Sequence, residues 1–120
     1  MCGILGFYLK RDSKLNWKNL LIDLYSLSES RGKEASGIAI RHQGKLYVLR
    51  HDKPASDLIR SKKFKELLKS IDLKRGDLVL IGHTRLVTHG DQTLMANNQP
   101  AVSNGVITIH NGIVCNYPSI

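Results

Sequence analysis

Cysteines and long apolar runs are both scarce in this 120-residue chain. The two cysteines, Cys2 and Cys115, form neither a CxxC pair nor a zinc-binding spacing, so the chain has at most one disulfide, and reduced thiols in a cytoplasmic setting fit better. No apolar run approaches the roughly 18 residues of a membrane span, and the N-terminal apolar stretch meets Lys10 and Arg11 too early for a signal peptide. We therefore expect one soluble domain over residues 1–120, without a membrane partner.

Acidic residues are also few, 10 against 18 basic ones, which gives a net charge of +8. The densest basic run lies between Arg60 and Arg75, and its one aromatic residue, Phe64, belongs to the apolar face of the predicted helix, so the run lacks aromatics that could stack on bases. This pattern indicates a solvated helix face, so nucleic acid is not an expected partner. A polyanion-binding patch is the alternative, and weak, salt-dependent binding of DNA or RNA would support it.

The spacing of apolar residues predicts alternating strands and helices, an α+β class of fold. A cap at Asn16 marks one helix start, and Gln43-Gly44 reads as a hairpin turn. Residues 86–104 read mostly as loop. The predicted strands cover residues 2–9, 37–42, 45–50, 77–82, 106–110 and 113–115, and the predicted helices cover residues 17–29 and 54–70.

Cys2 becomes a nucleophile that carries its own base if Met1 is removed. A thiol with a pKa of about 8.5 is only slightly ionised at pH 7, whereas a free α-amino group with a pKa of about 7.7 can accept the thiol proton. The cysteine side chain is small, which makes the usual removal of the initiator methionine before it plausible. The alternative is a buried cysteine in the first strand.

Several polar side chains follow the apolar strand that leads to Gly82. Arg85 offers a planar fork that suits a carboxylate, and Thr88 and His89 add hydrogen-bonding groups beside it. Such a strand end can form a binding site. A surface loop with an ordinary ion pair is the alternative.

Asn111-Gly112 lies between apolar segments, which is a strong signal for a tight hairpin turn. An Asn side-chain amide and a Gly backbone N–H on one turn can also donate to one oxygen, as in an oxyanion hole. The two interpretations are compatible.

Together these segments resemble the class II glutamine amidotransferase domain in their order and approximate spacing. The forms at residues 82–85 and 110–112 look most like the glucosamine-6-phosphate synthase branch, whereas residues 98–100 lean toward the phosphoribosyl amidotransferase pattern. The matching segments are Cys2-Gly3-Ile4, Arg31-Gly32 through Ile38, Gly82-His83-Thr84-Arg85 with Thr88-His89-Gly90, Asn98-Gln99-Pro100, and His110-Asn111-Gly112 through Tyr117.

The resemblance implies an N-terminal nucleophile hydrolase fold, a four-layer αββα sandwich of two antiparallel sheets with helices outside. It implies release of ammonia from the side-chain amide of L-glutamine, with no metal and no cofactor. A synthase domain or subunit would use the ammonia in an amination such as amino-sugar phosphate synthesis.

The resemblance also implies a role for each matched residue. Cys2 attacks the amide, and Asn111 and Gly112 hold the oxyanion. Arg85 binds the α-carboxylate of glutamine. The side chains that complete the pocket are Thr88 and His89, which line it, and Arg31, which orders the loop around the nucleophile.

Two departures from the family pattern stand out. Leu86 occupies the place where the synthase branch usually has Trp, and Asp91 does not match the family's aspartate for the α-amino group of glutamine. We therefore expect only the N-terminal half to two-thirds of the fold, as a truncated product, a fragment, or a subunit that completes its sheet in a homo- or hetero-oligomer. Alone, it should hydrolyse glutamine weakly or not at all. A catalytically inactive interaction module, favoured by retention of Met1, is the alternative.

Overall fold

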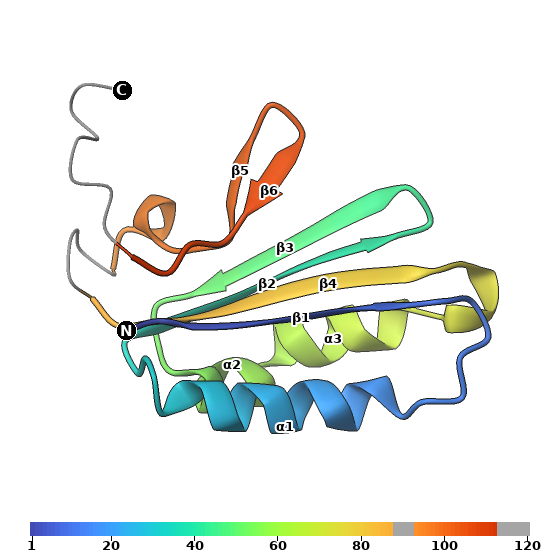
Figure 1. Cartoon of the computed structure of the whole chain (residues 1–120), viewed down its shortest axis with the longest axis horizontal. Coiled ribbons are helices and arrows are strands. Elements are labelled where there is room, and N and C mark those ends of the chain that lie inside the picture. The colour runs from blue at the N-terminus through green and yellow to red at the C-terminus, as the bar shows by residue number, and fades with distance from the viewer. Residues whose placement is uncertain (88–92, 113–120) are drawn as a thin grey trace.

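The structure is a computed structural model that describes residues 1–87 and 93–112. Four strands form an antiparallel sheet in the order β1-β4-β2-β3 (Figure 1). These strands are β1 (Gly3–Leu9), β2 (Ala35–His42), β3 (Lys45–His51) and β4 (Leu78–Arg85). The predicted α+β class is confirmed.

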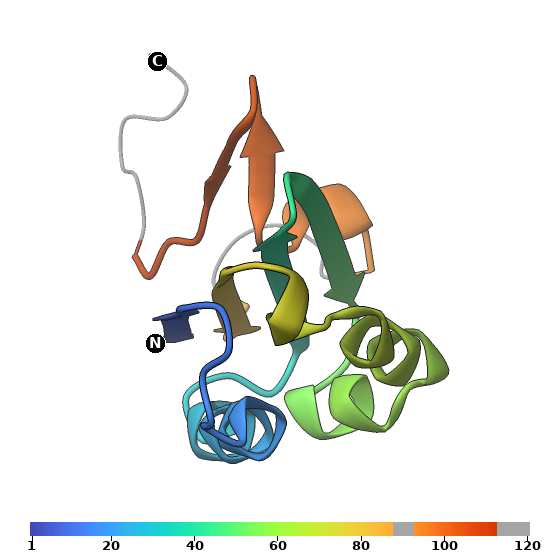
Figure 2. The same cartoon turned by 90° about the vertical axis from the view of Figure 1, so that its right-hand side faces the viewer.

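Helices cover one face of this sheet, and a small hairpin stands on the other side (Figures 1 and 2). The helices are α1 (Trp17–Glu29), α2 (Ala55–Arg60), α3 (Lys62–Ser70) and the short 3₁₀ turn η1 (Leu73–Arg75). The opposite side carries the 3₁₀ turn η2 (Met95–Asn97) and a two-stranded sheet of β5 (Ala101–Ser103) and β6 (Val106–Thr108). Within the described ranges, no helix is both long and apolar enough to cross a bilayer.

Helix α1 agrees with the prediction from its sequence. Trp17, Leu21 and Tyr25 recur every four residues and are buried together against the sheet. Asn16 caps the helix, because its Oδ1 accepts a hydrogen bond from the N–H of Asn19 at 3.3 Å. Leu27, another apolar residue of this helix, is 73% exposed.

The predicted helix over residues 54–70 is in fact two helices. Ser61 has extended backbone (ψ 147°) and separates α2 from α3. Its Oγ accepts a hydrogen bond from the N–H of Phe64 at 3.2 Å, so Ser61 caps the second helix. The apolar spacing continues across the break, and Leu58 and Phe64 are both buried, so periodicity alone does not reveal it. The lysines of α3 are exposed.

Strand β4 is longer than the predicted strand over residues 77–82. His83, Thr84 and Arg85 still belong to it, because Thr84 pairs with Gly3 on one side and Ser36 on the other. The polar character of these residues suggested a strand end. Their neighbours on both sides instead satisfy the backbone, and all three residues are buried.

The sequence did not reveal the β5–β6 hairpin, which begins inside the predicted loop. Its turn is Asn104-Gly105, with φ of 49° and 77°, the left-handed pair that a tight two-residue hairpin requires. The predicted strand over residues 106–110 ends at Thr108. The predicted strand over residues 113–115 lies outside the described residues, as do Cys115 and Asp91.

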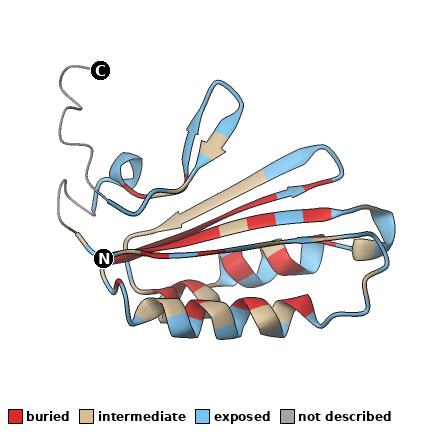
Figure 3. Ribbon diagram, in the orientation of Figure 1, coloured by how far each residue is buried: buried red, intermediate tan, exposed pale blue. Residues whose placement is uncertain are grey.

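The core lies between the sheet and its helices (Figure 3). Tyr25 and Phe64 meet edge to face there, with ring centroids 6.2 Å apart. We call the other side of the sheet the open face, defined by Ile4, Leu46 and Val79, which are 42 to 51% exposed. The fully buried core side chains include Leu21, Ile38, Ile40, Leu58, Leu78 and Leu80.

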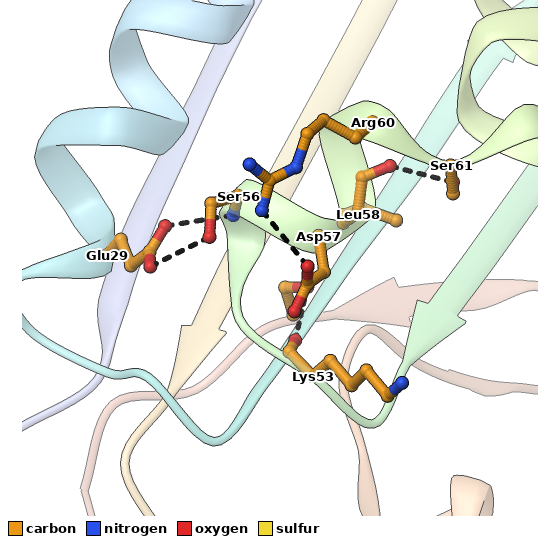
Figure 4. A network of polar contacts seen from close by, with 8 residues as sticks. Glu29, Lys53, Ser56, Asp57, Leu58, Arg60 and Ser61 are labelled. Carbon is orange, nitrogen blue, oxygen red and sulfur yellow. Dashed lines mark hydrogen bonds and ion pairs between the residues drawn. The ribbon is translucent and has the colours of Figure 1, made fainter.

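A polar network ties the end of α1 to the start of α2 (Figure 4). The carboxylate of Glu29 accepts hydrogen bonds from the N–H of Ser56 at 2.8 Å and from its Oγ at 3.1 Å. Ser36 of β2 donates to the carbonyl of Lys53 at 2.9 Å. Because α1 is held at its C-terminal end, the loop that leads from it to β2 has a fixed start.

Candidate active site

Cys2 immediately precedes β1 and is half-buried. Its backbone N–H donates to Oδ1 of Asn111 at 3.2 Å, and Nε of Arg31 donates to its carbonyl at 3.4 Å. Its Sγ lies 3.7 Å from the carbonyl oxygen of Leu86. Three segments that are remote in sequence therefore meet at Cys2, and two of them contribute predicted site residues, Arg31 and Asn111.

Asn111 presents its side-chain amide to the nucleophile in one orientation. A backbone N–H can only donate, so the atom that faces Cys2 is the acceptor Oδ1, and the donor Nδ2 is the other end of the amide. The next residue, Gly112, has a φ of 147°, which is open to glycine and rarely to other residues. An Asn side-chain amide and a Gly backbone N–H are donors of the kind that a developing oxyanion needs, and this role of the pair stays a prediction.

Gly32 explains how Arg31 reaches the nucleophile. A Cβ at Gly32 would overlap the backbone carbonyl of Arg85, so only glycine lets this loop lie directly against the end of β4. The N–H of Glu34 then donates to the same Arg85 carbonyl at 3.1 Å. A hollow beside this loop is lined by Met1, Ser30, Arg31, Lys33, Glu34 and Leu86.

Arg85 lies at the same end of the sheet as Cys2, because Gly3 pairs with Thr84. It is 8% exposed, and its Nη1 donates to Oδ1 of Asn98 at 2.8 Å. Binding of a substrate carboxylate by Arg85 stays a prediction. Thr88 and His89, expected beside it, lie outside the described residues.

The sequence did not assign a functional role to residues 98–100, yet they make several hydrogen bonds around the site. Oε1 of Gln99 accepts from the N–H of His110, and its Nε2 donates to the carbonyl of His110 at 3.1 Å. Arg50 donates to the carbonyl of Pro100 at 2.8 Å. Side-chain amides next to one another at Asn97, Asn98 and Gln99 were the available signal.

His83 is a second site residue to which the sequence gave no role. It is 1% exposed, and its Nε2 lies 3.2 Å from the carbonyl oxygen of His110. A carbonyl only accepts, so Nε2 carries the proton. Burial lowers the pKa of His83, and Arg85 nearby adds to this effect against the opposing His110 hydrogen bond, so the site favours the neutral ring.

Among the residues that the structure describes, no group of three or more His, Cys, Asp or Glu side chains could hold a metal ion. The donors around Cys2 are instead amide and guanidinium groups, which suit the carbonyl and carboxylate of an organic substrate. A thiol beside a carboxamide at the end of an antiparallel sheet defines a candidate amide-cleaving site.

Comparison with known proteins identifies the family. The chain is 35% identical over 117 residues to glutamine–fructose-6-phosphate aminotransferase (isomerizing) of Xylella fastidiosa. The matched region covers 98% of this chain and 17% of that protein. The chain is 39% identical over 117 residues to the enzyme of the same name from Bartonella quintana, with the same coverage. The protein of that name from Pyrococcus horikoshii is 27% identical over 121 residues, covering 100% of this chain and 18% of that protein.

The chain is related to the class II glutamine amidotransferase domains. In particular, it is homologous over its whole length to the glutaminase-domain region at the N-terminal end of glutamine–fructose-6-phosphate aminotransferase. It spans 17 to 18% of the length of these relatives. No family model matches the chain, and no solved structure matches it significantly.

Proposed function

We propose that this chain carries the nucleophile and the oxyanion site of a glutaminase half-reaction, in which the side-chain amide of L-glutamine is cleaved to glutamate and ammonia. The observation that carries the proposal is the 3.2 Å contact between the backbone nitrogen of Cys2 and Oδ1 of Asn111, across 109 residues of sequence. After removal of Met1, that nitrogen is the α-amino group. The proposed base and the proposed oxyanion donor therefore touch each other.

In the proposed mechanism, the neutral α-amino group of Cys2 takes the thiol proton while its N–H bond to Asn111 holds it in place. The thiolate attacks the amide carbon, and Asn111 Nδ2 and the Gly112 N–H stabilise the oxyanion. The ammonium group of Cys2 then protonates the leaving nitrogen. Water hydrolyses the resulting thioester and releases glutamate.

Substrate binding is assigned to the residues around this centre. Arg85 binds the α-carboxylate of glutamine as a bidentate partner, with Thr88 and His89 lining the pocket. Arg31 holds the carbonyl of Cys2 and so limits the motion of the nucleophile, a role that its 3.4 Å contact supports. The proposed reaction needs no metal and no cofactor.

The released ammonia would serve an amination on a synthase domain or partner subunit in the cytoplasm, such as the synthesis of an amino-sugar phosphate. The relatives' names specify fructose 6-phosphate as their acceptor. The apolar open face supports the four-layer sandwich, because exposed Ile4, Leu46 and Val79 are where a second sheet would pack. That sheet could belong to the same protein or to a homo- or hetero-oligomer.

Covalent labelling of Cys2 tests the proposal. Intact-mass measurement should show loss of Met1, and 6-diazo-5-oxo-L-norleucine, a glutamine-shaped electrophile, should add once to the chain. Cys2→Ala should abolish both the addition and any ammonia release from glutamine, whereas the matched variant Cys115→Ala should leave both unchanged. Ammonia release that survives in Cys2→Ala would overturn the mechanism. Retained Met1 without labelling would favour an inactive interaction module.

A further inference from the structure

We propose that Gln99 and His83 are positioning residues that hold the peptide of His110 and thereby place Asn111 and Gly112 against Cys2. This inference rests on the proposed function, because it assigns the supports of the proposed oxyanion site. Neither residue touches Cys2 in a described contact. Their effect on the reaction is therefore exerted through the main chain of His110.

The Gln99 carboxamide holds His110 at two points. Its Nε2 donates to the His110 carbonyl at 3.1 Å, and its Oε1 accepts from the His110 N–H. His83 adds a third contact, because its Nε2 donates to the same carbonyl at 3.2 Å. A carbonyl oxygen has two lone pairs, so both donors can be accommodated. Both the N–H and the carbonyl of the residue that directly precedes Asn111 are thus held.

We call Gln99 and His83, which both hold His110, the clamp, and its Gln99 side is anchored to the sheet. A Cβ at Gly37 in β2 would overlap the carbonyl oxygen of Gln99, so the two backbones are in direct contact there. Arg50 of β3 donates to the Pro100 carbonyl at 2.8 Å, and Arg85 of β4 donates to Asn98 at 2.8 Å. Three strands therefore seat the segment that carries Gln99, which makes it a rigid support rather than a free loop.

The state of His83 suits a fixed donor. The ring is buried, and its Nδ1 has no hydrogen-bond partner in the described part of the chain. A neutral ring with the proton on Nε2 keeps the contact to His110 without placing a charge in this desolvated position. His83 therefore acts as a neutral hydrogen-bond donor, and its role ends with any side chain that lacks an N–H there.

The position of Asn111 matters because catalytic groups must be held close to their productive geometry. A displacement of about 1 Å can lower a rate roughly 100-fold. His110 is adjacent to Asn111 in sequence, so rotation of its peptide would draw Asn111 away from the nitrogen of Cys2. Loss of the clamp should therefore lower kcat more than it raises the KM for glutamine.

The test measures glutamine hydrolysis by the full chain, after loss of Met1. Gln99→Ala should lower kcat about 10- to 100-fold with a less than about threefold change in KM. Gln99→Glu keeps the acceptor for the His110 N–H and loses the donor to the His110 carbonyl. Its kcat should therefore lie between those of the wild type and Gln99→Ala. The control is Gln43→Ala, which removes another glutamine side chain that donates to a backbone carbonyl, that of Arg75 at 3.4 Å, remote from the site. It should leave kcat unchanged.

A second pair of variants separates positioning from packing at His83. Gln places an N–H close to where Nε2 of His lies, so His83→Gln should retain most of the kcat, while His83→Leu should lose about 10-fold or more. Urea unfolding of each variant shows whether it is folded under assay conditions. Equal kcat in wild type and Gln99→Ala, or equal loss in His83→Gln and His83→Leu, would overturn the inference.

The proposed function can fail without deciding the inference. If the wild-type chain is neither labelled nor active, the positioning role is read from ¹⁵N NMR of the Asn111 side-chain amide and the Cys2 nitrogen. Both resonances should move in Gln99→Ala and stay in place in Gln43→Ala. Unmoved resonances in Gln99→Ala would overturn the positioning role independently of activity.

Discussion

Polar contacts hold both ends of the main sheet, and one side-chain contact at each end shows how much their burial can differ. At the end far from Cys2, the carboxylate of Asp77 accepts from the Tyr8 hydroxyl at 2.5 Å and from the Arg11 N–H at 2.6 Å, in contact with solvent. At the site end, Arg85 donates to Asn98 at 2.8 Å, and both residues are buried.

This difference in burial decides what each contact is worth. Water replaces a lost partner at the exposed end, so such a contact adds little to the free energy of unfolding. At the buried end, the remaining group stays desolvated and unpaired. The site end therefore depends on a complete set of polar partners, whereas the far end depends mainly on the apolar core beneath it.

Gly37→Ala should break the buried end most strongly. Its Cβ would overlap the carbonyl of Gln99, which is backbone and cannot move without unseating the whole segment. We expect a loss of about 3 kcal/mol in the free energy of unfolding, measured by urea denaturation, because overpacking of this kind distorts the main chain. Labelling of Cys2 should slow as well.

The matched control for this variant is Gly76→Ala at the far end of the sheet. A Cβ there would meet only side-chain atoms, at 3.4 Å or beyond, and the backbone is extended with a φ of 169°. Its unfolding midpoint should stay close to that of the wild type. An equal loss in both variants would contradict the special role of the Gly37 contact.

Asn98→Ala should have the next largest effect. It removes the Oδ1 atom that accepts from Nη1 of Arg85, a contact between two buried residues that water does not readily replace. The expected loss is about 2 kcal/mol in the free energy of unfolding, again from urea denaturation. A loss no larger than that of the exposed variant below would show that burial does not separate the two ends.

Asp77→Asn at the exposed end should have the smallest effect, and one that depends on pH. The Tyr8 hydrogen bond, followed by that from Arg11, lowers the pKa of Asp77 from its ordinary value of 3.8. Because the folded-state pKa is lowered, the Asp77 carboxylate adds to the free energy of unfolding at a pH above its unfolded-state pKa. This contribution is lost as the pH falls through its folded-state pKa.

The measurement is the difference in urea midpoint between wild type and Asp77→Asn at pH 7 and at pH 3. The difference should be small at pH 7 and smaller still at pH 3, where the wild-type carboxyl begins to protonate. A difference that grows as the pH falls would contradict this assignment. Tyr8→Phe removes the hydroxyl donor, so the folded-state pKa of Asp77 should be lowered less. The stability of this variant should therefore depend less on pH than that of the wild type.

Features that depend on neighbours in sequence were predictable. The helix over residues 17–29, its Asn16 cap and the Gln43-Gly44 turn agree with the structure, because a cap, a turn and an apolar face are each formed within a few residues. The break at Ser61 was missed because serine is compatible with both a helix and a cap. The extent of β4 was missed because the partners of His83 and Thr84 lie on other strands.

The candidate site shows the same division between features that a local sequence pattern reveals and features that depend on remote partners. Cys2, Arg31, Arg85, Asn111 and Gly112 were named from the sequence by their side-chain chemistry and their resemblance to one family. Gln99 and His83 were not given roles, because a side-chain amide or imidazole that binds a backbone 11 or 27 residues away leaves no local pattern. Thr88 and His89 stay predictions.

The sequence by itself determined the class of fold, the helix-forming and strand-forming segments, the family and a candidate nucleophile. Only the tertiary structure decided that the nitrogen of Cys2 meets Asn111, and that a clamp anchored on three strands holds the peptide before Asn111. Periodicity and motif chemistry are local properties of a chain. A contact across 109 residues exists only once sheet pairing has brought its ends together.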